Sequence, residues 1–379
     1  MPQIFSQNFN YVDWNKLFEV NWKRLRQGMK ERQIDSLIVQ DVANVKYLTG
    51  YSPMYSYFML NTMVAVFPKD AERPTLFPIW YYVDFVKTKY PWLKEIKPIP
   101  VSMSEWPEEF NKLGLGERVG YDAAMTHALG KQLEISLKGK ELVDAEDLLW
   151  RTRSVKNPEE LKVIELATAI AEIGFKKAFE ISIEGLKEFE VAAEIEYSLR
   201  KAGAEGATHC LAISGDNAAL CQEISTDKII RNHDAVIFDF GAQFEGYNAE
   251  YARTRFVGSP SKEQKEVYHL VYESEQKAIQ NIKPGIKCAD VDKLSRKIIG
   301  EGGYEKFEFN YNLGHGIGTS VWEYPIVDQR SQATFEPNMV VALEPAVYKL
   351  GMGGVRIEDL VKVTQNGCEI LTKTDYHYL

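Results

Sequence analysis

Acidic residues stand inside two strand-like, otherwise apolar segments of the second half of the chain, and this feature constrains the fold most. Residues 235–257, AVIFDFGAQFEGYNAEYARTRFV, form an apolar run, a polar turn and an alternating run, a pattern typical of a β-hairpin. Folding this segment about Phe244 and Glu245 places Asp239 opposite Glu250. Because like charges directly opposed across two strands destabilise the pair, this hairpin needs a compensating positive charge.

Residues 339–363, MVVALEPAVYKLGMGGVRIEDLVKV, repeat the arrangement. Folding them about Gly351 places Glu344 opposite Glu358. In one hairpin, two carboxylates that face solvent would explain the pattern equally well; in two hairpins with strands this apolar, burial is favoured. A bare charge is costly to bury, so we predict that a cation holds the four carboxylates together.

His315 lies in a glycine-rich turn, 312–318, with the sequence NLGHGIG. A lone histidine in a loop is usually a polar surface residue, but glycines on both sides let the backbone approach a ligand and are expected to expose the imidazole. The candidate metal ligands are therefore Asp239, Glu250, His315, Glu344 and Glu358. Four carboxylates and one imidazole suit Mn, Co, Fe or Zn, and they fit two divalent ions about 3.5–4 Å apart that share bridging carboxylates and a bridging water.

These segments also carry a family resemblance. DFGAQFEGYNAEYART resembles the D-x-G-x(4)-G-Y-x-x-D-x-x-R-T pattern of the pita-bread metallopeptidases, which include methionine aminopeptidase, aminopeptidase P, prolidase and the metal-free creatinase. LGHGIG, ALEPAVY and GGVRIED match the family's later blocks in the same order. The resemblance covers essentially the whole chain and is closest to the prolidase and creatinase branch. It implies that the five candidate residues occupy the five metal-ligand positions, and that Glu344 lies beside the attacking water and acts as general base.

The chain departs from the peptidase pattern at three positions. Glu250 stands where the family normally has Asp, and the extra methylene moves its carboxylate by about a bond length. In SGDNAALCQE, residues 214–223, Gln222 stands where proline peptidases have His, and it cannot carry a proton. In WEYP, Trp322 replaces the His of the family's H-E-x-P block and offers one N–H and a large apolar face. These changes predict a pocket rebuilt around another small molecule, with an aromatic wall for a cationic or cyclic substrate.

The candidate catalytic residues are Glu344, Gln222 and Glu323, the last retained from the H-E-x-P block. Two arginines, Arg253 and Arg356, are candidates for holding the metal ligands in position. Arg253 is predicted to pair with a ligand carboxylate, whereas Arg356 could do the same or bind a substrate carboxylate with both nitrogens. A surface ion pair is the alternative for both.

The segment NVKYLTGYSPMYSYFML, residues 44–60, is rich in tyrosine. It resembles the N-terminal segment of creatinase and ectoine hydrolase, which reaches into the partner's active site in a homodimer. Tyr51, Tyr55 and Tyr57 are therefore candidate substrate-binding residues, together with Trp322 and Arg356. A core strand and its turn explain the segment equally well. A second aromatic segment, WYYVDF at 80–85, is predicted to be core.

The chain is predicted to form two domains. Residues 1–152 alternate helices and strands, with a helix at 13–32 that Asp13 is predicted to cap and strands at 36–40, 63–68 and 75–79, which favours an α/β domain of the creatinase/prolidase N-terminal type. In residues 153–379, helix pairs alternate twice with hairpins, which matches the pseudo-twofold α+β pita-bread fold that the resemblance implies for a catalytic domain. Helices are predicted from Pro158 to about Glu180, at 186–203, from Ser261 to 283–285 and at 289–299, with capping residues at Asn157 and Ser261.

Composition excludes several classes of partner. A net charge of −9 over 379 residues, without a basic cluster, argues against nucleic acid and anionic membranes. The N-terminal residues do not resemble a secretory signal, and no apolar stretch approaches the length of a membrane span. Four scattered cysteines without a C-x-x-C pair suit a reducing compartment, so a cytoplasmic location is expected.

Together these observations predict a hydrolase that cleaves a C–N bond in a small substrate, similar to an Xaa-Pro dipeptidase with a dinuclear metal centre. A dipeptide or another small molecule is the expected substrate, and the resemblance implies a homodimer. Three alternatives stay open: a metal-independent hydrolase of the creatinase or ectoine hydrolase type, a metal-dependent lyase that acts on a small osmolyte, and a non-catalytic binding module.

Overall fold

The computed structural model describes residues 11–52, 63–123, 125–221, 224–309 and 311–377. They form two compact units, one made of residues 11–153 with 157–159 and the other of residues 154–156 with those from 160 onwards.

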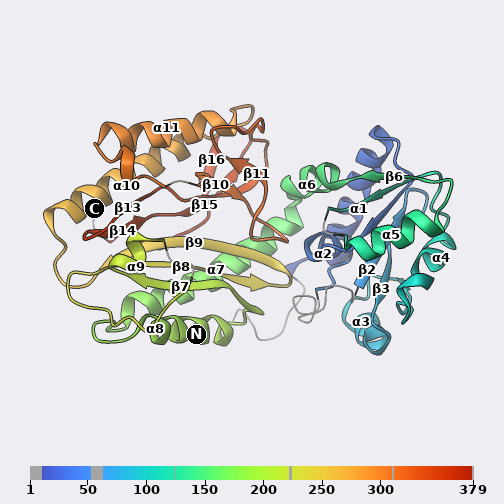
Figure 1. Cartoon of the computed structure of the whole chain (residues 1–379), viewed down its shortest axis with the longest axis horizontal. Helices are drawn as coiled ribbons and strands as arrows, with labels where there is room; N and C mark the ends of the chain where they lie inside the picture. Colours follow the sequence, from blue (N-terminus) through green and yellow to red (C-terminus); the bar gives the residue numbers. More distant parts are fainter. Residues whose placement is uncertain (1–10, 53–62, 124, 222–223, 310, 378–379) are drawn as a thin grey trace. The chain divides into compact units, whose positions relative to one another are not determined.

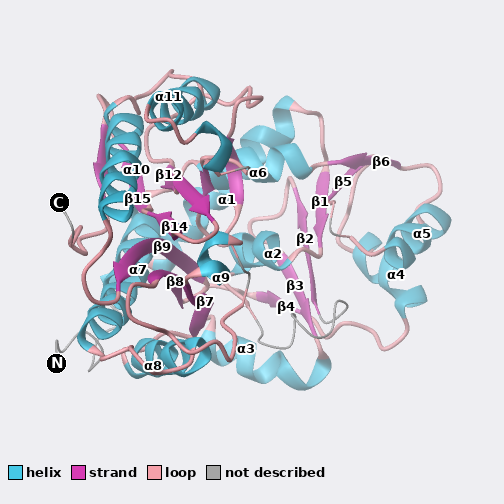
Figure 2. Cartoon of the chain, turned by 60° about the vertical axis from the view of Figure 1, so that its left-hand side comes forward, coloured by secondary structure: helices cyan, strands magenta, loops and turns pink. Residues whose placement is uncertain are grey.

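The N-terminal unit is built on a mixed sheet with the strand order β4-β3-β2-β1-β5-β6 (Figure 2). Strand β1 is antiparallel to β2 and parallel to β5, and β5 is parallel to β6. Side chains of these strands pack with α4 and α5 in one apolar core. In chain order the elements are α1 (Trp14–Glu31), β1 (Ser36–Val39), α2 (Val42–Thr49), β2 (Met63–Pro68), β3 (Thr75–Pro78), η3 (Trp80–Tyr82), α3 (Val83–Lys89), β4 (Glu95–Ile96), η4 (Met103–Glu105), α4 (Trp106–Asn111), β5 (Arg118–Tyr121), α5 (His127–Ser136), β6 (Glu141–Asp144) and α6 (Glu146–Ser154).

Local signals explain the first helix. The carboxylate of Asp13 accepts a hydrogen bond from the backbone N–H of Lys16, so it caps α1 as its position in the sequence predicts. Leu17, Phe18 and Leu25 then form one buried stripe at helical spacing. The α/β prediction for this unit is confirmed.

The aromatic segment at 80–85 differs from its prediction. Trp80, Tyr81 and Phe85 are 65%, 49% and 52% exposed, so they are not core residues. The segment forms a short 3-10 helix followed by α3, and Val86 is the residue of α3 that turns inward. Aromatic density alone did not reveal which side of the helix faces the sheet.

The C-terminal unit stacks its sheets between two pairs of helices (Figures 1 and 2). The sheet β7-β8-β9 packs on α7 and α8, and the sheet β11-β10-β12-β15-β16 packs on α10 and α11. This repeat of a helix pair and a sheet confirms the predicted pita-bread architecture. Its elements are α7 (Pro158–Glu180), α8 (Glu188–Lys201), β7 (Gly206–Ser214), α9 (Asp216–Ala219), β8 (Ala235–Phe244), β9 (Tyr247–Phe256), α10 (Lys262–Gln280), α11 (Cys288–Glu301), η5 (Glu305–Phe307), β10 (Gly314–Gly316), β11 (Glu323–Val327), β12 (Val340–Leu343), β13 (Ala346–Lys349), β14 (Gly353–Arg356), β15 (Asp359–Val363) and β16 (Cys368–Ile370).

The first predicted hairpin exists, but its predicted register is wrong by two residues. Strands β8 and β9 pair Asp239 with Ala252 and Gly241 with Glu250. The turn residues are Glu245 and Gly246, both with positive φ, which is the two-residue turn whose twist suits a hairpin. Because side chains alternate with a period of two, Asp239 and Glu250 still lie on the same face of the sheet.

The second hairpin has the predicted register. Ala346 pairs with Arg356 in β13 and β14, and Leu343 pairs with Asp359 in β12 and β15. Glu344 and Glu358 therefore lie opposite each other at the break between these two paired stretches. Within the described residues, no helix is both long enough and apolar enough to cross a membrane.

Candidate metal centre

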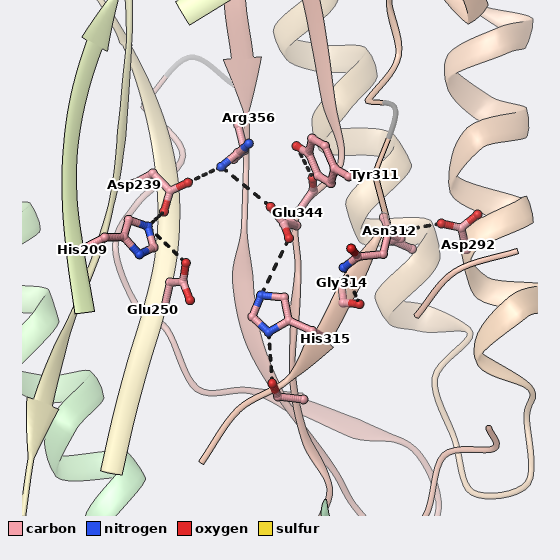
Figure 3. A network of polar contacts seen from close by, with 12 residues as sticks. His209, Asp239, Glu250, Asp292, Tyr311, Asn312, Gly314, His315, Glu344 and Arg356 are labelled. Atoms are coloured by element: carbon pink, nitrogen blue, oxygen red, sulfur yellow. Dashed lines mark hydrogen bonds and ion pairs between the residues drawn. The ribbon is translucent and has the colours of Figure 1, made fainter. Parts of the chain in front are cut away.

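The five predicted ligands come together in the C-terminal unit. Each is at most 5% exposed, and they come from β8, β9, β10, the end of β12 and the start of β15: Asp239, Glu250, His315, Glu344 and Glu358. Figure 3 shows the side chains of Asp239, Glu250, Glu344 and His315 around one space. Ligand atoms of Glu250, His315 and Glu358 lie within 4.8 Å of one another, and His315 Nε2 lies 3.7 Å from Glu344 Oε1.

Several of these oxygens are buried without a hydrogen bond. Glu250 Oε2, Glu344 Oε1 and both carboxylate oxygens of Glu358 have no hydrogen-bond partner among the described residues. A buried acceptor left unsatisfied costs about 1–3 kcal/mol, and more when it is charged. Unsatisfied carboxylate oxygens that converge with an imidazole are the donor set of a divalent metal site, so the residues fit such ions.

The pKa values of the clustered carboxyl groups in the metal-free protein reflect their burial and their closeness to one another. Burial raises the pKa of Glu344 to about 8 and that of Glu250 to about 7, and the neighbouring carboxylates add to both shifts. Burial also raises the pKa of Glu358 well above its usual range. Burial would raise the pKa of Asp239 as well, but the positive charges of His209 and Arg356 hold it at about 2. Three of the four carboxyl groups therefore retain protons to near neutral pH unless a cation replaces them.

His315 is buried rather than exposed, which corrects the prediction from its flanking glycines. Its side chain is 1% exposed, and its ring stacks on Trp322 with ring centroids 4.6 Å apart. The glycines serve close strand packing: a Cβ at Gly314 would lie 2.0 Å from the carbonyl oxygen of Ala342, and one at Gly316 would lie 2.3 Å from that of Tyr324. His315 Nδ1 donates to the carbonyl of Gly316 at 3.0 Å, which directs Nε2 toward the carboxylates.

His209 is a site residue that the sequence analysis missed. It lies in β7, a strand that was not predicted, and its Nε2 is 2.8 Å from Asp239 Oδ1 and 3.2 Å from Glu250 Oε1. Burial alone would lower the pKa of His209, but the charges of Asp239 and Glu250 raise it to about 9. The apolar run at 211–213 could have indicated the strand, but nothing local indicates its partner.

The two arginines differ from each other. Arg356 Nη1 binds Asp239 and lies 3.7 Å from Glu344 Oε2, so it pairs with ligand carboxylates. Its Nε and Nη2 donate to the hydroxyl of Tyr348 at 2.9 and 2.6 Å, and Tyr348 in turn contacts the hydroxyl of Tyr311.

Arg253, in contrast, does not pair with a ligand carboxylate as predicted. It donates to Asp359 Oδ1 at 2.6 Å and to the backbone carbonyl of Glu358 at 2.6 Å. Its side chain points to the opposite face of β9 from Glu250, because three residues along a strand change the face. Arg253 therefore fixes the backbone that carries Glu358.

The other candidate catalytic and substrate-binding residues differ in exposure and in the unit to which they belong. Trp322 is 52% exposed and covers the ring of His315, whereas Glu323 is buried in an ion pair with Lys156 at 2.6 Å. Tyr51 is buried in the N-terminal unit and meets the ring of Tyr90 edge-on. The other three candidates, Gln222, Tyr55 and Tyr57, lie outside the described residues.

The shifted groups predict how pH affects the metal-free protein. Glu250, Glu344 and His209 all have raised pKa values, so the folded state holds protons that the unfolded chain releases. The free energy of unfolding should therefore fall as pH rises from about 6.5 to 8, by on the order of 1 kcal/mol per pH unit for Glu344 and for His209, and Glu250 adds to this slope only up to its pKa of about 7. The lowered pKa of His315, about 4, acts with the opposite sign but only below 6.5. Urea unfolding in the presence of a chelator measures this slope.

Saturating Mn²⁺ provides the control for this pH series, because a bound cation displaces the protons and should flatten the slope above pH 6.5. Stability of the metal-free protein that stays constant or rises over the same interval would contradict the buried, uncompensated carboxylates.

Comparisons with known proteins agree with this geometry. A model of the Metallopeptidase family M24 matches residues 162–365, and a model of the Creatinase/Prolidase N-terminal domain matches residues 22–155. The Xaa-Pro dipeptidase of Pyrococcus horikoshii is 36% identical over 355 residues, which are 93% of this chain and 97% of that protein. The Xaa-Pro dipeptidase of Pyrococcus furiosus is 33% identical over 94% of this chain and 99% of its own. The crystal structure of the prolidase from Pyrococcus horikoshii OT3 superposes with a TM-score of 0.85 at 32% identity, over 95% of this chain and all of that one.

Proposed function

We propose, since the chain belongs to metallopeptidase family M24, that it hydrolyses the C–N bond of a small peptide-type substrate at the cluster of buried carboxylates. A dipeptide with proline in second place is the leading candidate, because the relatives named Xaa-Pro dipeptidase match almost the whole chain. The observation that carries the proposal is the set of buried, unsatisfied oxygens of Glu250, Glu344 and Glu358 around His315. Such a set is stable only around cations or protons.

Asp239, Glu250, His315, Glu344 and Glu358 would hold two divalent ions. When bound, the ions supply polarisation of the substrate carbonyl and a water of lowered pKa. Glu344 is the candidate general base: its Oε1 has no hydrogen-bond partner among the described residues and is the atom that would take the proton of the attacking water. The same carboxyl would return that proton to the departing nitrogen as the C–N bond breaks.

Neighbouring residues prepare this carboxylate for its role. The backbone N–H of Glu344 donates to the carbonyl of Leu313 at 2.8 Å, which joins it to the strand that carries His315. The N–H of Leu313 in turn donates to buried Asp292 at 3.0 Å. The positions of base and imidazole are therefore coupled through one backbone segment that α11 supports.

Trp322 bears on substrate choice. It places a half-exposed aromatic face against His315 where proline-peptidase relatives are expected to have a second imidazole. Such a face can pack against a proline ring or a cationic group but cannot carry a proton. We therefore propose a preference for cyclic or cationic residues, with slower turnover than an additional histidine would permit.

A substrate panel tests the proposed function. Protein stripped with a chelator would be assayed on Xaa-Pro dipeptides, matched Xaa-Ala dipeptides, creatine and ectoine, with and without added Mn²⁺ or Co²⁺. We expect hydrolysis of at least one Xaa-Pro dipeptide that is lost on chelation and restored by metal. Absence of turnover across the panel with metal bound would contradict the proposal.

One observation favours a metal-independent hydrolase as the second candidate. Arg356 and His209 place two cationic groups against Asp239, so part of the negative charge is compensated by the protein itself. For this candidate the same assay gives the opposite result, because activity would persist in the chelator.

The finer properties stay predictions. Mn, Co, Fe and Zn are all compatible with the donor set, and we propose a homodimer and a cytoplasmic location. Metal analysis, light scattering and cell fractionation would address them in turn.

A further inference from the structure

Three residues on adjacent strands lie side by side at the edge of the carboxylate cluster: His209 in β7, Gly241 in β8 and Glu250 in β9. Gly241 in the central strand β8 pairs with Glu250 in β9. On its other side, the pairing of β7 with β8 shifts between Ala207 and Cys210, so that one additional residue of β7 stands opposite Gly241. A β-bulge of this kind bends the strand locally and redirects a side chain.

His209 is the side chain that this bulge directs toward the site. Gly241 has no side chain, so His209 and Glu250 approach each other across it, and Figure 3 shows the imidazole between Asp239 and Glu250. The distances from His209 Nε2 are 2.8 Å to Asp239 Oδ1 and 3.2 Å to Glu250 Oε1. These three residues offer ligand atoms within 4.8 Å of one another.

The spacing fits ligands of one ion. With metal–ligand bonds of about 2.1 Å, two ligands at adjacent corners of an octahedron lie about 3.0 Å apart. The two distances from His209 Nε2, 2.8 and 3.2 Å, fall on either side of this value. Arg356 binds the other oxygen of Asp239, Oδ2, which leaves Oδ1 directed toward His209.

Glu250 belongs to two candidate groups. One group is His209, Asp239 and Glu250, and the other is Glu250, His315 and Glu358. Glu250 Oε1 faces His209, whereas Oε2 has no hydrogen-bond partner among the described residues. A carboxylate shared in this way is suited to bridge two ions, one beside each imidazole.

We propose that His209 Nε2 is a direct ligand of the metal ion held by Asp239 and Glu250, in addition to the five ligands that the family resemblance implies. The inference rests on the proposed metal centre. It gives each ion one imidazole, which shifts the donor set from a preference for Mn²⁺ toward Co²⁺ and Zn²⁺. His209 also lines a surface hollow of about 390 Å³ with Phe189 and Glu196, so this ion lies near a route from solvent.

Two measurements on the full chain test the role of His209. Isothermal titration of chelator-stripped protein with Zn²⁺ gives stoichiometry and affinity for the unchanged protein, His209→Ala and His209→Asn. We expect at least about a tenfold loss of affinity for one of two ions in both variants, because loss of even an outer partner of a ligand costs about 10–100-fold. His269→Ala, at an exposed position of α10, is the matched control and should bind as the unchanged protein does.

X-ray absorption at the zinc edge supplies a second readout that does not depend on a variant. Outer-shell scattering counts imidazoles on the metal, and we expect two per pair of ions in the unchanged protein and one in His209→Ala. Unchanged affinity in both variants, or one imidazole per pair of ions in the unchanged protein, would overturn the proposal and leave the five-ligand centre in place. Failure of the unchanged protein to bind Zn²⁺ at all would overturn the metal centre and this proposal together.

Discussion

Glu344→Gln is expected to lower kcat by about 10²- to 10⁴-fold, the range that a positioned general base contributes. The amide has nearly the same shape but cannot accept the proton of the attacking water. The effect should be large here because Glu344 is 5% exposed, so bulk water has little access to replace the missing base. The measurement is kcat with saturating metal on the best substrate of the panel, together with the metal content of the same preparation.

Glu301→Gln is the matched control, since the side chain of Glu301 at the end of α11 is 67% exposed and pairs with Lys297 at 3.6 Å. It should retain full activity. A Glu344→Gln protein that keeps its metal and retains kcat within a factor of ten would show that the base lies elsewhere. Loss of metal together with activity would instead identify Glu344 as a ligand first.

Lys156→Met is expected to lower the free energy of unfolding by about 3–5 kcal/mol, because removing one partner of a buried ion pair takes away the counter-charge of the other. Lys156 Nζ lies 2.6 Å from Glu323 Oε1, and both side chains are 1% exposed. Glu323 stands in β11 beside Gly316, so its loss of charge compensation should also disturb the strand that carries His315. Urea unfolding of the metal-free proteins measures the change.

Lys349→Met breaks an exposed ion pair, Lys349–Glu263, and serves as the control for the buried pair. Lys349 and Glu263 are also in contact, but their side chains are 33% and 40% exposed, so solvent screens the pair and the expected loss of stability is much smaller than for Lys156→Met. Equal effects of the two substitutions would show that burial of the Lys156–Glu323 pair has no energetic consequence. The double variant Lys156→Met, Glu323→Gln should recover part of the stability, because it removes both charges.

Local signals were sufficient for α1, α7, α8, α10 and α11 and for one hairpin, whereas residues 44–49, for which a core strand was one alternative, lie in helix α2. Asp13 and Ser261 cap their helices as the sequence predicts, and α7 begins at Pro158 after Asn157 accepts a hydrogen bond from the N–H of Glu159. The register of the hairpin that carries Glu344 was also correct. Capping and short-range pairing depend on neighbouring residues, which a single sequence displays directly.

The register of the other hairpin was wrong because it depends on which two residues form the turn. Positive φ at both Glu245 and Gly246 moves the turn, and Asp239 then pairs with Ala252 instead of Glu250. The error of two residues preserved the face of the sheet, so the convergence of the carboxylates was still predicted. An error of one residue would have placed Glu250 on the opposite face.

Long-range features were outside the reach of the sequence analysis. His209 joins the site through a bulge in β7, whose partner strand begins more than twenty residues later in the chain. Burial of His315 depends on β11, β12 and the ring of Trp322, none of which is adjacent to it in sequence. Arg253 was assigned to a ligand carboxylate because it is near Glu250 in the chain, whereas its partner Asp359 comes from another strand.

The count of divalent ions bound by the protein tests the metal centre most directly. Chelator-stripped protein would be equilibrated with Mn²⁺, Co²⁺ or Zn²⁺ at pH 8, separated from free ion and analysed by mass spectrometry of the metal, beside a variant with Glu358→Ala. We predict two ions per chain in the unchanged protein and fewer in the variant. Less than one ion per chain with all three metals, in a protein that is folded, would contradict a metal centre at these carboxylates.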